Sequence, residues 1–227
     1  MPDTSPETSA EDSAHPSPSR SAIAAIILAA GRSQRMGQPK LLLPLGGEPL
    51  VRCAVRAACA STAHPMLVVL GHEAEAVRQA LPAGDYITIF NADYASGMAS
   101  SLRTGIAALT APTASAAPLA GAVILLADQP LVTARHINNL LAIAARQPEA
   151  IVASSIAGQR GTPVYFPAAL FGELLQITGD EGGRSVIARH PDRLRLYAIA
   201  EAEVALDVDD PAAYQRLLAL WPHHSTA

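Results

Sequence analysis

Short apolar runs alternate with segments of helical periodicity along most of the chain. The runs that predict buried strands are 22–30, 65–71, 86–90 and 121–130. The segments that predict helices are 49–61, 73–81, 99–110 and 133–147, with Pro49 in the first turn of one and Thr133 as the N-cap of another. Strands that alternate with helices across short connections indicate βαβ units. We therefore expect a Rossmann-like three-layer α/β/α sandwich around a mostly parallel sheet.

The pattern becomes less regular in the second half of the chain. The runs "EAIVASSI" (149–156) and "TPVYFP" (162–167) flank the turn sequence "AGQRG" and predict an antiparallel hairpin added to the sheet. A strand over 193–199 and a helix over 211–220 are expected to follow. The fold class is thus α/β, with a small antiparallel addition in the second half.

The first twenty residues differ in composition from the rest. Residues 1–20 are rich in Pro, Ser, Thr and acidic residues and lack the basic start and apolar centre of a targeting segment, which predicts a disordered tail. We expect a single domain over 21–222 and a short C-terminal tail over 223–227.

Composition and charge narrow the classes of function. Half of the residues are apolar and 16% are charged, which supplies a sizeable core. The net charge of −4 points to no nucleic-acid partner and no membrane, and no apolar run has the length of a membrane span. The two cysteines, Cys53 and Cys59, have neither the spacing of a zinc site nor the number for a disulfide framework. We therefore expect two packed free thiols in a protein of the reducing cytoplasm.

A glycine-containing basic loop follows the first predicted strand. In an open α/β sheet, ligands bind beyond the carboxyl ends of the strands, where this loop would lie. Gly31 and Gly37 allow close backbone approach to an anion, and Arg32, Arg35 and Lys40, the only lysine of the chain, add positive charge. The spacing fits neither of the two standard nucleotide motifs, so the glycines alone favour an ordinary solvated turn.

Acidic residues expected at the same sheet edge change this balance. Asp128 closes a very apolar predicted strand, where an unpaired carboxylate is costly to bury. Asp207, Asp209 and Asp210 stand in "DVDDP"; Asp210 is explained as an N-cap ahead of Pro211. Each aspartate alone could be a solvated surface residue. A basic loop and hard oxygen ligands at one edge indicate Mg²⁺-assisted phosphoryl or nucleotidyl transfer.

These segments also occur together in one known family. The stretch "LAAGRSQRMGQPK" (28–40) resembles the LAAGxSxRMGxxK motif of the MobA-like nucleotidyltransferases, most closely the molybdenum cofactor cytidylyltransferase branch. The likeness continues, in the order of the family, through "NADYASGMASSLRTGI", "LLADQP", "RGTPVYF", "GDEGGR" and "DVDDP". It covers roughly residues 22–220.

The resemblance implies an activity and its substrates. A cytidylyltransferase of this branch would transfer CMP from CTP to the terminal phosphate of molybdopterin or the molybdenum cofactor, with Mg²⁺, and release pyrophosphate. Its partners would be CTP, the pterin molybdenum cofactor and a recipient molybdoenzyme of the xanthine dehydrogenase type. Ala30 in "LAAG" is the mark of the cytidylyl branch, since the guanylyl branch usually has glycine there.

The resemblance also assigns roles to individual residues. The residues implied to bind the nucleotide are Leu28, Ala29, Ala30, Gly31, Arg32, Ser33, Arg35, Met36, Gly37, Lys40, Gly97, Ser100 and Ser101. Those implied to be catalytic are Arg35, Lys40 and Asp128, and those implied to hold the metal are Asp128, Asp209 and Asp207. The residues implied to line the pocket of the second substrate are Gln129, Arg160, Gly161, Pro163, Asp180, Gly182 and Arg184.

Two departures from the family pattern and several alternatives remain. Gly183 stands where the family usually has alanine, and "DVDDP" has Asp210 where threonine is usual before the proline. The alternatives are use of GTP, transfer to another phosphate such as that of a sugar or polyol, and a non-catalytic carrier of the cofactor. A plain α/β domain with a solvated loop is the remaining possibility.

Overall fold

A computed structural model describes residues 21–112 and 118–224, with side chains up to Trp221. The predicted N-terminal tail, 1–20, lies outside the described residues. The last helix runs to His224, two residues into the predicted C-terminal tail, and residues 225–227 lie outside the description.

A seven-stranded sheet forms the centre of the molecule. Its strands are β1 (Ala22–Ala29), β4 (Met66–Leu70), β5 (Ile87–Phe90), β6 (Leu119–Leu126), β7 (Ile151–Ile156), β8 (Gln159–Pro167) and β9 (Leu194–Ile199). The spatial order is β5-β4-β1-β6-β8-β7-β9. Only β8 is antiparallel to its neighbours, and the other pairs are parallel. The predicted mostly parallel sheet with an antiparallel hairpin is confirmed.

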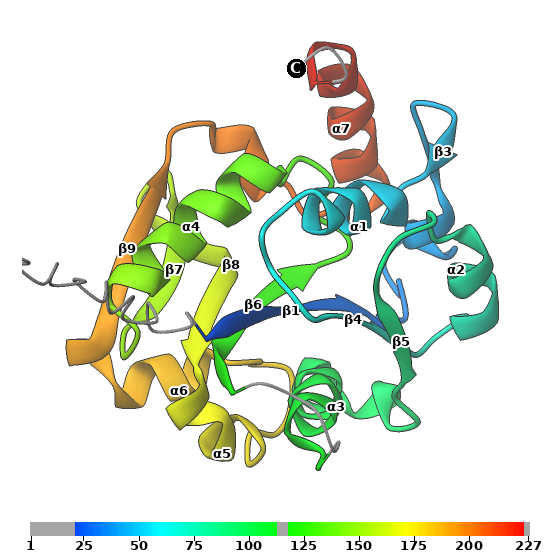
Figure 1. Ribbon diagram of the computed structural model, residues 1–227. Helices are drawn as coiled ribbons and strands as arrows, with labels where there is room; N and C mark the ends of the chain where they lie inside the picture. The colour runs from blue at the N-terminus through cyan, green and yellow to red at the C-terminus, as the bar shows by residue number, and fades with distance from the viewer. Residues whose placement is uncertain (1–20, 113–117, 225–227) are drawn as a thin grey trace, which may run out of the picture.

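Helices cover both faces of this sheet. They are α1 (Val51–Cys59), α2 (Ala74–Ala80), α3 (Met98–Thr110), α4 (Ala134–Arg146), α5 (Phe171–Leu174), α6 (Arg184–Arg189) and α7 (Pro211–His224). Short 3₁₀ turns occupy Lys40–Leu42, Tyr94–Ser96, Ala168–Leu170, Pro191–Arg193 and Ala202–Ala205. Helices α1 and α4 lie over one face, and α3, α5 and α6 lie over the other (Figure 1). The predicted three-layer sandwich is confirmed.

The central strands are apolar throughout because both of their faces are buried. Along β1, Ala25 and Ile27 enter the hydrophobic cluster on the α1 and α4 side, whereas Ala24 and Ile26 enter the cluster on the α3 side. Successive side chains of a strand point to opposite faces, so a strand between two helical layers needs apolar residues at every position. The apolar run 22–30 is therefore a direct sign of this layered core.

Two helix starts agree with the capping residues read from the sequence. The Thr133 Oγ1 accepts a hydrogen bond from the His136 backbone N–H at 3.4 Å, and the His136 Nδ1 accepts one from the Thr133 N–H at 3.2 Å. At α7, the Asp210 carboxylate accepts a hydrogen bond from the Ala213 N–H at 2.7 Å, with Pro211 as the first helical residue. Both caps satisfy backbone groups that a helix terminus leaves unpaired.

The start of α1 differs from the prediction. Pro49 lies in a short strand, β3 (Glu48–Pro49), which pairs with β2 (Pro44–Leu45) in a two-stranded antiparallel sheet, and α1 begins at Val51. The reason is the turn between the two strands, where Gly46 and Gly47 have φ of +60° and +85°. Two successive positive φ angles form the tight hairpin turn that matches strand twist.

The two cysteines are free thiols. Cys53 on α1 is partly buried, and burial raises the pKa of its thiol to about 11. Cys59 is exposed at the end of the same helix. Their separate environments agree with the expected absence of a disulfide. Within the described part of the chain, the helices are too short or too polar to cross a membrane.

Close packing of α3 on the sheet generates a stability prediction. A Cβ at Gly105 would lie 2.6 Å from the Ile26 Cγ2, a β-branched side chain with little freedom to move. Gly105→Ala is expected to lower the free energy of unfolding by about 1–3 kcal/mol, although alanine favours helix by about 1 kcal/mol at open positions. The matched control is Gly172→Ala on α5, where a Cβ meets nothing within 4 Å. Urea unfolding measures both, and equal stability of the two variants would contradict the packing.

Candidate active site

A pocket of about 580 Å³ lies at the carboxyl edge of the sheet, where β1 and β6 end and α3 begins. We call it the first pocket. The residues expected to bind a nucleotide that line it are Leu28, Ala29, Ala30, Gly31, Arg32, Ser33, Arg35, Lys40, Gly97 and Ser101. Three expected residues do not line it, namely Met36, Gly37 and Ser100. The loop predicted from its glycines and charges is therefore at a cavity, and not an isolated solvated turn.

The loop after β1 is a folded turn that presents Lys40. The Ser33 carbonyl accepts hydrogen bonds from the backbone N–H groups of Met36 and Gly37, at 3.1 and 3.2 Å. The Ser33 hydroxyl accepts another from the Lys40 N–H, at 3.1 Å. Met36 is buried in the core, so it anchors the turn instead of facing a ligand. Gly37 provides the left-handed backbone, φ +71°, that closes the turn.

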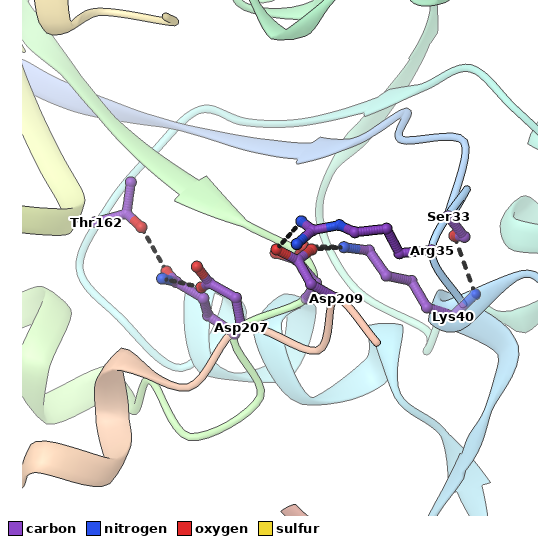
Figure 2. A network of polar contacts seen from close by, with 8 residues as sticks. Ser33, Arg35, Lys40, Thr162, Asp207 and Asp209 are labelled. Atoms are coloured by element: carbon purple, nitrogen blue, oxygen red, sulfur yellow. Dashed lines mark hydrogen bonds and ion pairs between the residues drawn. The ribbon is translucent and has the colours of Figure 1, made fainter. Parts of the chain in front are cut away.

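Lys40 joins two carboxylates that lie far apart in the sequence. Its Nζ donates to the Asp209 Oδ1 at 2.7 Å and to the Asp128 Oδ2. The Arg35 Nη2 donates to the other Asp209 oxygen at 2.6 Å, so both cations reach Asp209 from the same loop (Figure 2). The Lys40 side chain is 11% exposed and that of Arg35 is 69% exposed. We call Arg35, Lys40, Asp128 and Asp209 the Lys40 cluster.

Electrostatics keep Lys40 and Asp209 ionised. Burial disfavours the Lys40 ammonium, but the neighbouring Asp128 and Asp209 outweigh burial and raise its pKa above the ordinary value. Burial likewise disfavours the Asp209 carboxylate, yet hydrogen bonds and charge from Lys40 and Arg35 lower its pKa below the ordinary value. Paired opposite charges thus hold both groups in the charged form at neutral pH.

The three aspartates expected to hold a metal are divided. Asp128 and Asp209 line the first pocket, whereas Asp207 faces a different cavity and accepts a hydrogen bond from the Gln129 Nε2 at 2.6 Å. Burial, followed by repulsion from Asp128, raises the pKa of Asp207 to about 6. Within the described ranges, no three His, Cys, Asp or Glu side chains lie close enough together to hold a metal ion. The donor set that fits Mg²⁺ is two carboxylates, with phosphate oxygens and water as the other ligands.

The cavity that Asp207 faces is larger, about 690 Å³, and we call it the second pocket. The residues expected to bind a second substrate that line it are Gln129, Arg160, Gly161, Asp180, Gly182 and Arg184. Pro163 does not line it, whereas its neighbour Thr162 does. Leu28, Met98, Leu126 and Asp180 line both pockets, so the two cavities share a wall.

Ser100 is committed to the loop before α3. Its hydroxyl can donate its one proton to either the Gly97 or the Asp93 carbonyl, at 2.8 and 2.9 Å, and it accepts from the Asn91 Nδ2 at 2.8 Å. Asn91 also donates to the Ser101 hydroxyl at 3.0 Å. Of the two expected serines only Ser101 reaches the first pocket. The buried Asn91 was missed, although an amide directly after a strand is a recognisable sign of such a loop anchor.

The wall shared by the pockets depends on a glycine and a carboxylate. The Asp180 Oδ1 accepts a hydrogen bond from the Met98 N–H at 3.2 Å, at the start of α3. Gly97 has φ of +108°, and a Cβ there would lie 2.3 Å from the same oxygen. Neither Tyr94 nor Met98, which also line the first pocket, was identified from the sequence, because isolated aromatic and apolar residues carry no motif.

Comparison with known proteins finds a matching family and similar proteins. The MobA-like NTP transferase domain matches residues 25–194. The purine catabolism protein PucB of Bacillus subtilis (strain 168) is 33% identical over 193 residues, 82% of this chain and 89% of PucB. The nicotine blue oxidoreductase of Paenarthrobacter nicotinovorans is 29% identical over 205 residues, 86% of this chain and 96% of that protein.

Solved structures include a similar protein from Mycobacterium tuberculosis H37Rv. The crystal structure of Rv0371c has 31% identity and a TM-score of 0.74, and the match covers 88% of this chain and 99% of that one. The same protein has also been solved in complex with manganese, with 28% identity and a TM-score of 0.70 over 88% of this chain and 98% of that one.

The Lys40 cluster generates a prediction on stability and pH. In Lys40→Met, Asp128 and Asp209 would face each other without the ammonium, so we expect the free energy of unfolding at pH 7 to fall by about 2–4 kcal/mol. Because Lys40 lowers the pKa of Asp209 in the folded state, this stabilisation is complete above the ordinary carboxyl pKa and disappears as pH falls through the lowered one. The effect of the substitution should therefore be smaller at about pH 3, below the ordinary carboxyl pKa of 3.8, than at pH 7.

Urea unfolding of the parent and the variant at both pH values measures this difference. Arg35→Met is the matched control, since it removes the exposed cation of the same cluster and should cost less than about 1 kcal/mol. A Lys40→Met chain that is as stable as the parent at pH 7 would show that the ammonium is not what holds the carboxylates together.

Proposed function

The chain belongs to the MobA-like NTP transferase family and is a nucleotidyltransferase, and we propose that it transfers CMP from CTP to the terminal phosphate of the pterin molybdenum cofactor. The observation that carries the proposal is the Lys40 cluster in the first pocket, which shares a wall with the second pocket. One pocket would take the triphosphate and the other would take the acceptor. Ala30 lines the first pocket, in agreement with the cytidylyl form of the first motif.

The reaction exchanges one phosphoanhydride for another. A terminal phosphate oxygen of the acceptor forms a bond to the α-phosphorus of CTP, the bond to the bridging oxygen breaks, and pyrophosphate leaves with that electron pair. An acceptor phosphate is largely ionised near pH 7, so the attack needs no general base. This agrees with the linings of both pockets, whose described residues include no histidine.

The protein would position two anions in line and stabilise their charge. Lys40 and Arg35, which both line the first pocket, would hold the triphosphate. Lys40 is a compact point charge that can follow the phosphate as charge redistributes, whereas Arg35 is an exposed planar fork at the rim.

The donor set supports a divalent cation. Asp128 and Asp209 would hold Mg²⁺ from the protein side, and the crystal structure of Rv0371c with manganese supports a divalent metal in this fold. When bound, the ion would neutralise the oxygens of the triphosphate and of the leaving pyrophosphate.

The lining of the second pocket favours a heterocyclic acceptor over a sugar or polyol phosphate. One wall is apolar and includes Leu102, Ile124, Val164, Phe166 and Ile187. Arg160 and Arg184 add positive charge to the same cavity. A flat ring with an anionic end matches the apolar wall and the two guanidinium groups, whereas a polyhydroxylated chain offers no apolar surface to cover that wall.

The nucleotide and acceptor are tested by pyrophosphate release. Purified protein is given Mg²⁺, purified molybdenum cofactor and each of the four nucleoside triphosphates in turn, and release is expected with CTP alone and lost when EDTA removes the metal. Release with GTP would overturn the assignment of the base. Silence with all four, from folded protein and active cofactor, would exclude the proposed acceptor and favour another phosphate or a carrier role.

Substitutions in the Lys40 cluster test its role in turnover. Lys40→Met and Asp128→Asn are each expected to lower kcat at least about 100-fold, since the first removes an ammonium that would stabilise charge on the transferred phosphate and the second removes a carboxylate that would hold Mg²⁺. Asp192→Asn is the matched control, because Asp192 is exposed in the Pro191–Arg193 turn and lines neither pocket. A cluster variant with nearly unchanged turnover would remove that residue from the mechanism.

A further inference from the structure

Two short backbone segments direct their side chains alternately into the two pockets. Asp128 and Asp209 line the first pocket, whereas Gln129 and Asp207 line the second. Between the two aspartates of the later segment, Val208 is fully buried and its N–H donates to the Asp128 carbonyl at 3.1 Å. This hydrogen bond joins segment 128–129 to segment 207–209. A displacement of either segment would therefore move side chains in both pockets.

Gln129 is held at both ends of its amide. It is 4% exposed, its Nε2 donates to the Asp207 Oδ1 at 2.6 Å, and its Oε1 accepts from the Thr162 hydroxyl at 2.5 Å. Both ends of the amide therefore have a defined partner, the Asp207 carboxylate at one end and the Thr162 hydroxyl at the other. In Figure 2, Thr162 and Asp207 lie on one side of Asp209, and the Lys40 side chain reaches Asp209 from the other side.

The chain of contacts thus begins at the surface of the second pocket and ends at the Lys40 cluster. Thr162 lies on β8 and lines the second pocket, where an acceptor would contact it. From Thr162 the contacts pass to Gln129 and Asp207, and from there along the backbone to Asp128 and Asp209. Each step is a hydrogen bond or a covalent neighbour.

We propose that Thr162 and Gln129 are positioning residues through which the acceptor in the second pocket aligns the Lys40 cluster for the transfer. This inference rests on the proposed function, because it assigns the second pocket to the acceptor. An acceptor that packs against Thr162 restrains the Gln129 amide, and this restraint holds the carboxylates of the first pocket in register with the triphosphate. Loss of the Thr162–Gln129 or the Gln129–Asp207 hydrogen bond would then lower the rate of turnover more than it lowers the affinity for the nucleotide.

Four variants separate positioning from a general structural role. Thr162→Val removes the hydroxyl at nearly constant volume, Thr162→Ser retains it, and Gln129→Leu removes both amide contacts. The matched control is Thr104→Val on α3, which also loses a threonine hydroxyl bond, to the Ser100 carbonyl at 2.9 Å, but lines neither pocket.

The first measurement compares chemistry with binding. Pyrophosphate release with CTP, Mg²⁺ and molybdenum cofactor gives kcat, and calorimetry with a non-hydrolysable CTP analogue and Mg²⁺, without acceptor, gives nucleotide affinity. We expect kcat to fall about 10- to 100-fold in Thr162→Val and Gln129→Leu, with affinity for the analogue changed less than about two-fold. Thr162→Ser should recover most of the loss. A parallel loss of affinity and turnover would indicate a merely structural role and overturn the proposal.

The second measurement needs no turnover. Hydrogen exchange of the Val208 and Asp209 amides reports whether Thr162, in the second pocket, restrains the segment that enters the first. Protection of both amides should decrease in Thr162→Val and Gln129→Leu, and it should be retained in Thr162→Ser and Thr104→Val.

These two measurements distinguish failure of this inference from failure of the proposed function. If the parent chain turns over and the Thr162→Val and Gln129→Leu variants match it, the positioning role is wrong and the proposed function stands. If the parent shows no turnover, the proposed function fails, and unchanged exchange protection in the two variants would then overturn the link between the pockets as well.

Discussion

The ammonium of Lys40 between Asp128 and Asp209 is the interaction on which the site depends. The two carboxylates come from different parts of the chain and would repel each other at this distance in a partly buried environment. A compact ammonium with three donors fits between them, whereas the planar fork of arginine suits the exposed rim, where Arg35 lies. The only lysine of a chain that otherwise uses arginine stands at this position.

The sheet topology explains how one edge can serve two pockets. Strands β1 and β6 end at this edge, so the loops that follow them supply Lys40 and Asp128. Strand β8 runs in the opposite direction and therefore begins at the same edge, which brings Arg160 and Thr162 beside the end of β6. A fully parallel sheet would have placed the beginning of that strand at the far side. The single antiparallel strand thus completes the second pocket.

Local patterns were informative where one short segment determines the structure. The alternating core of β1, the cap of α4 at Thr133 and the cap of α7 at Asp210 follow from spacing and from backbone groups that need partners. The prediction of Pro49 in the first turn of a helix was wrong, because the Gly46–Gly47 turn is a stronger local signal and Pro49 lies in the hairpin that this turn forms. Asp207 was grouped with Asp209 because they are near in sequence, although their side chains enter different pockets.

The sequence by itself determined the layered α/β fold, the loop that presents Lys40 and the convergence of acidic residues on one sheet edge, since periodicity and motif order are local properties of the chain. Only the tertiary structure decided that Lys40 bridges Asp128 and Asp209 and that Thr162 contacts Gln129. These contacts join residues from separate strands and loops. Their partners depend on strand order, strand direction and side-chain packing, and no single segment encodes any of the three.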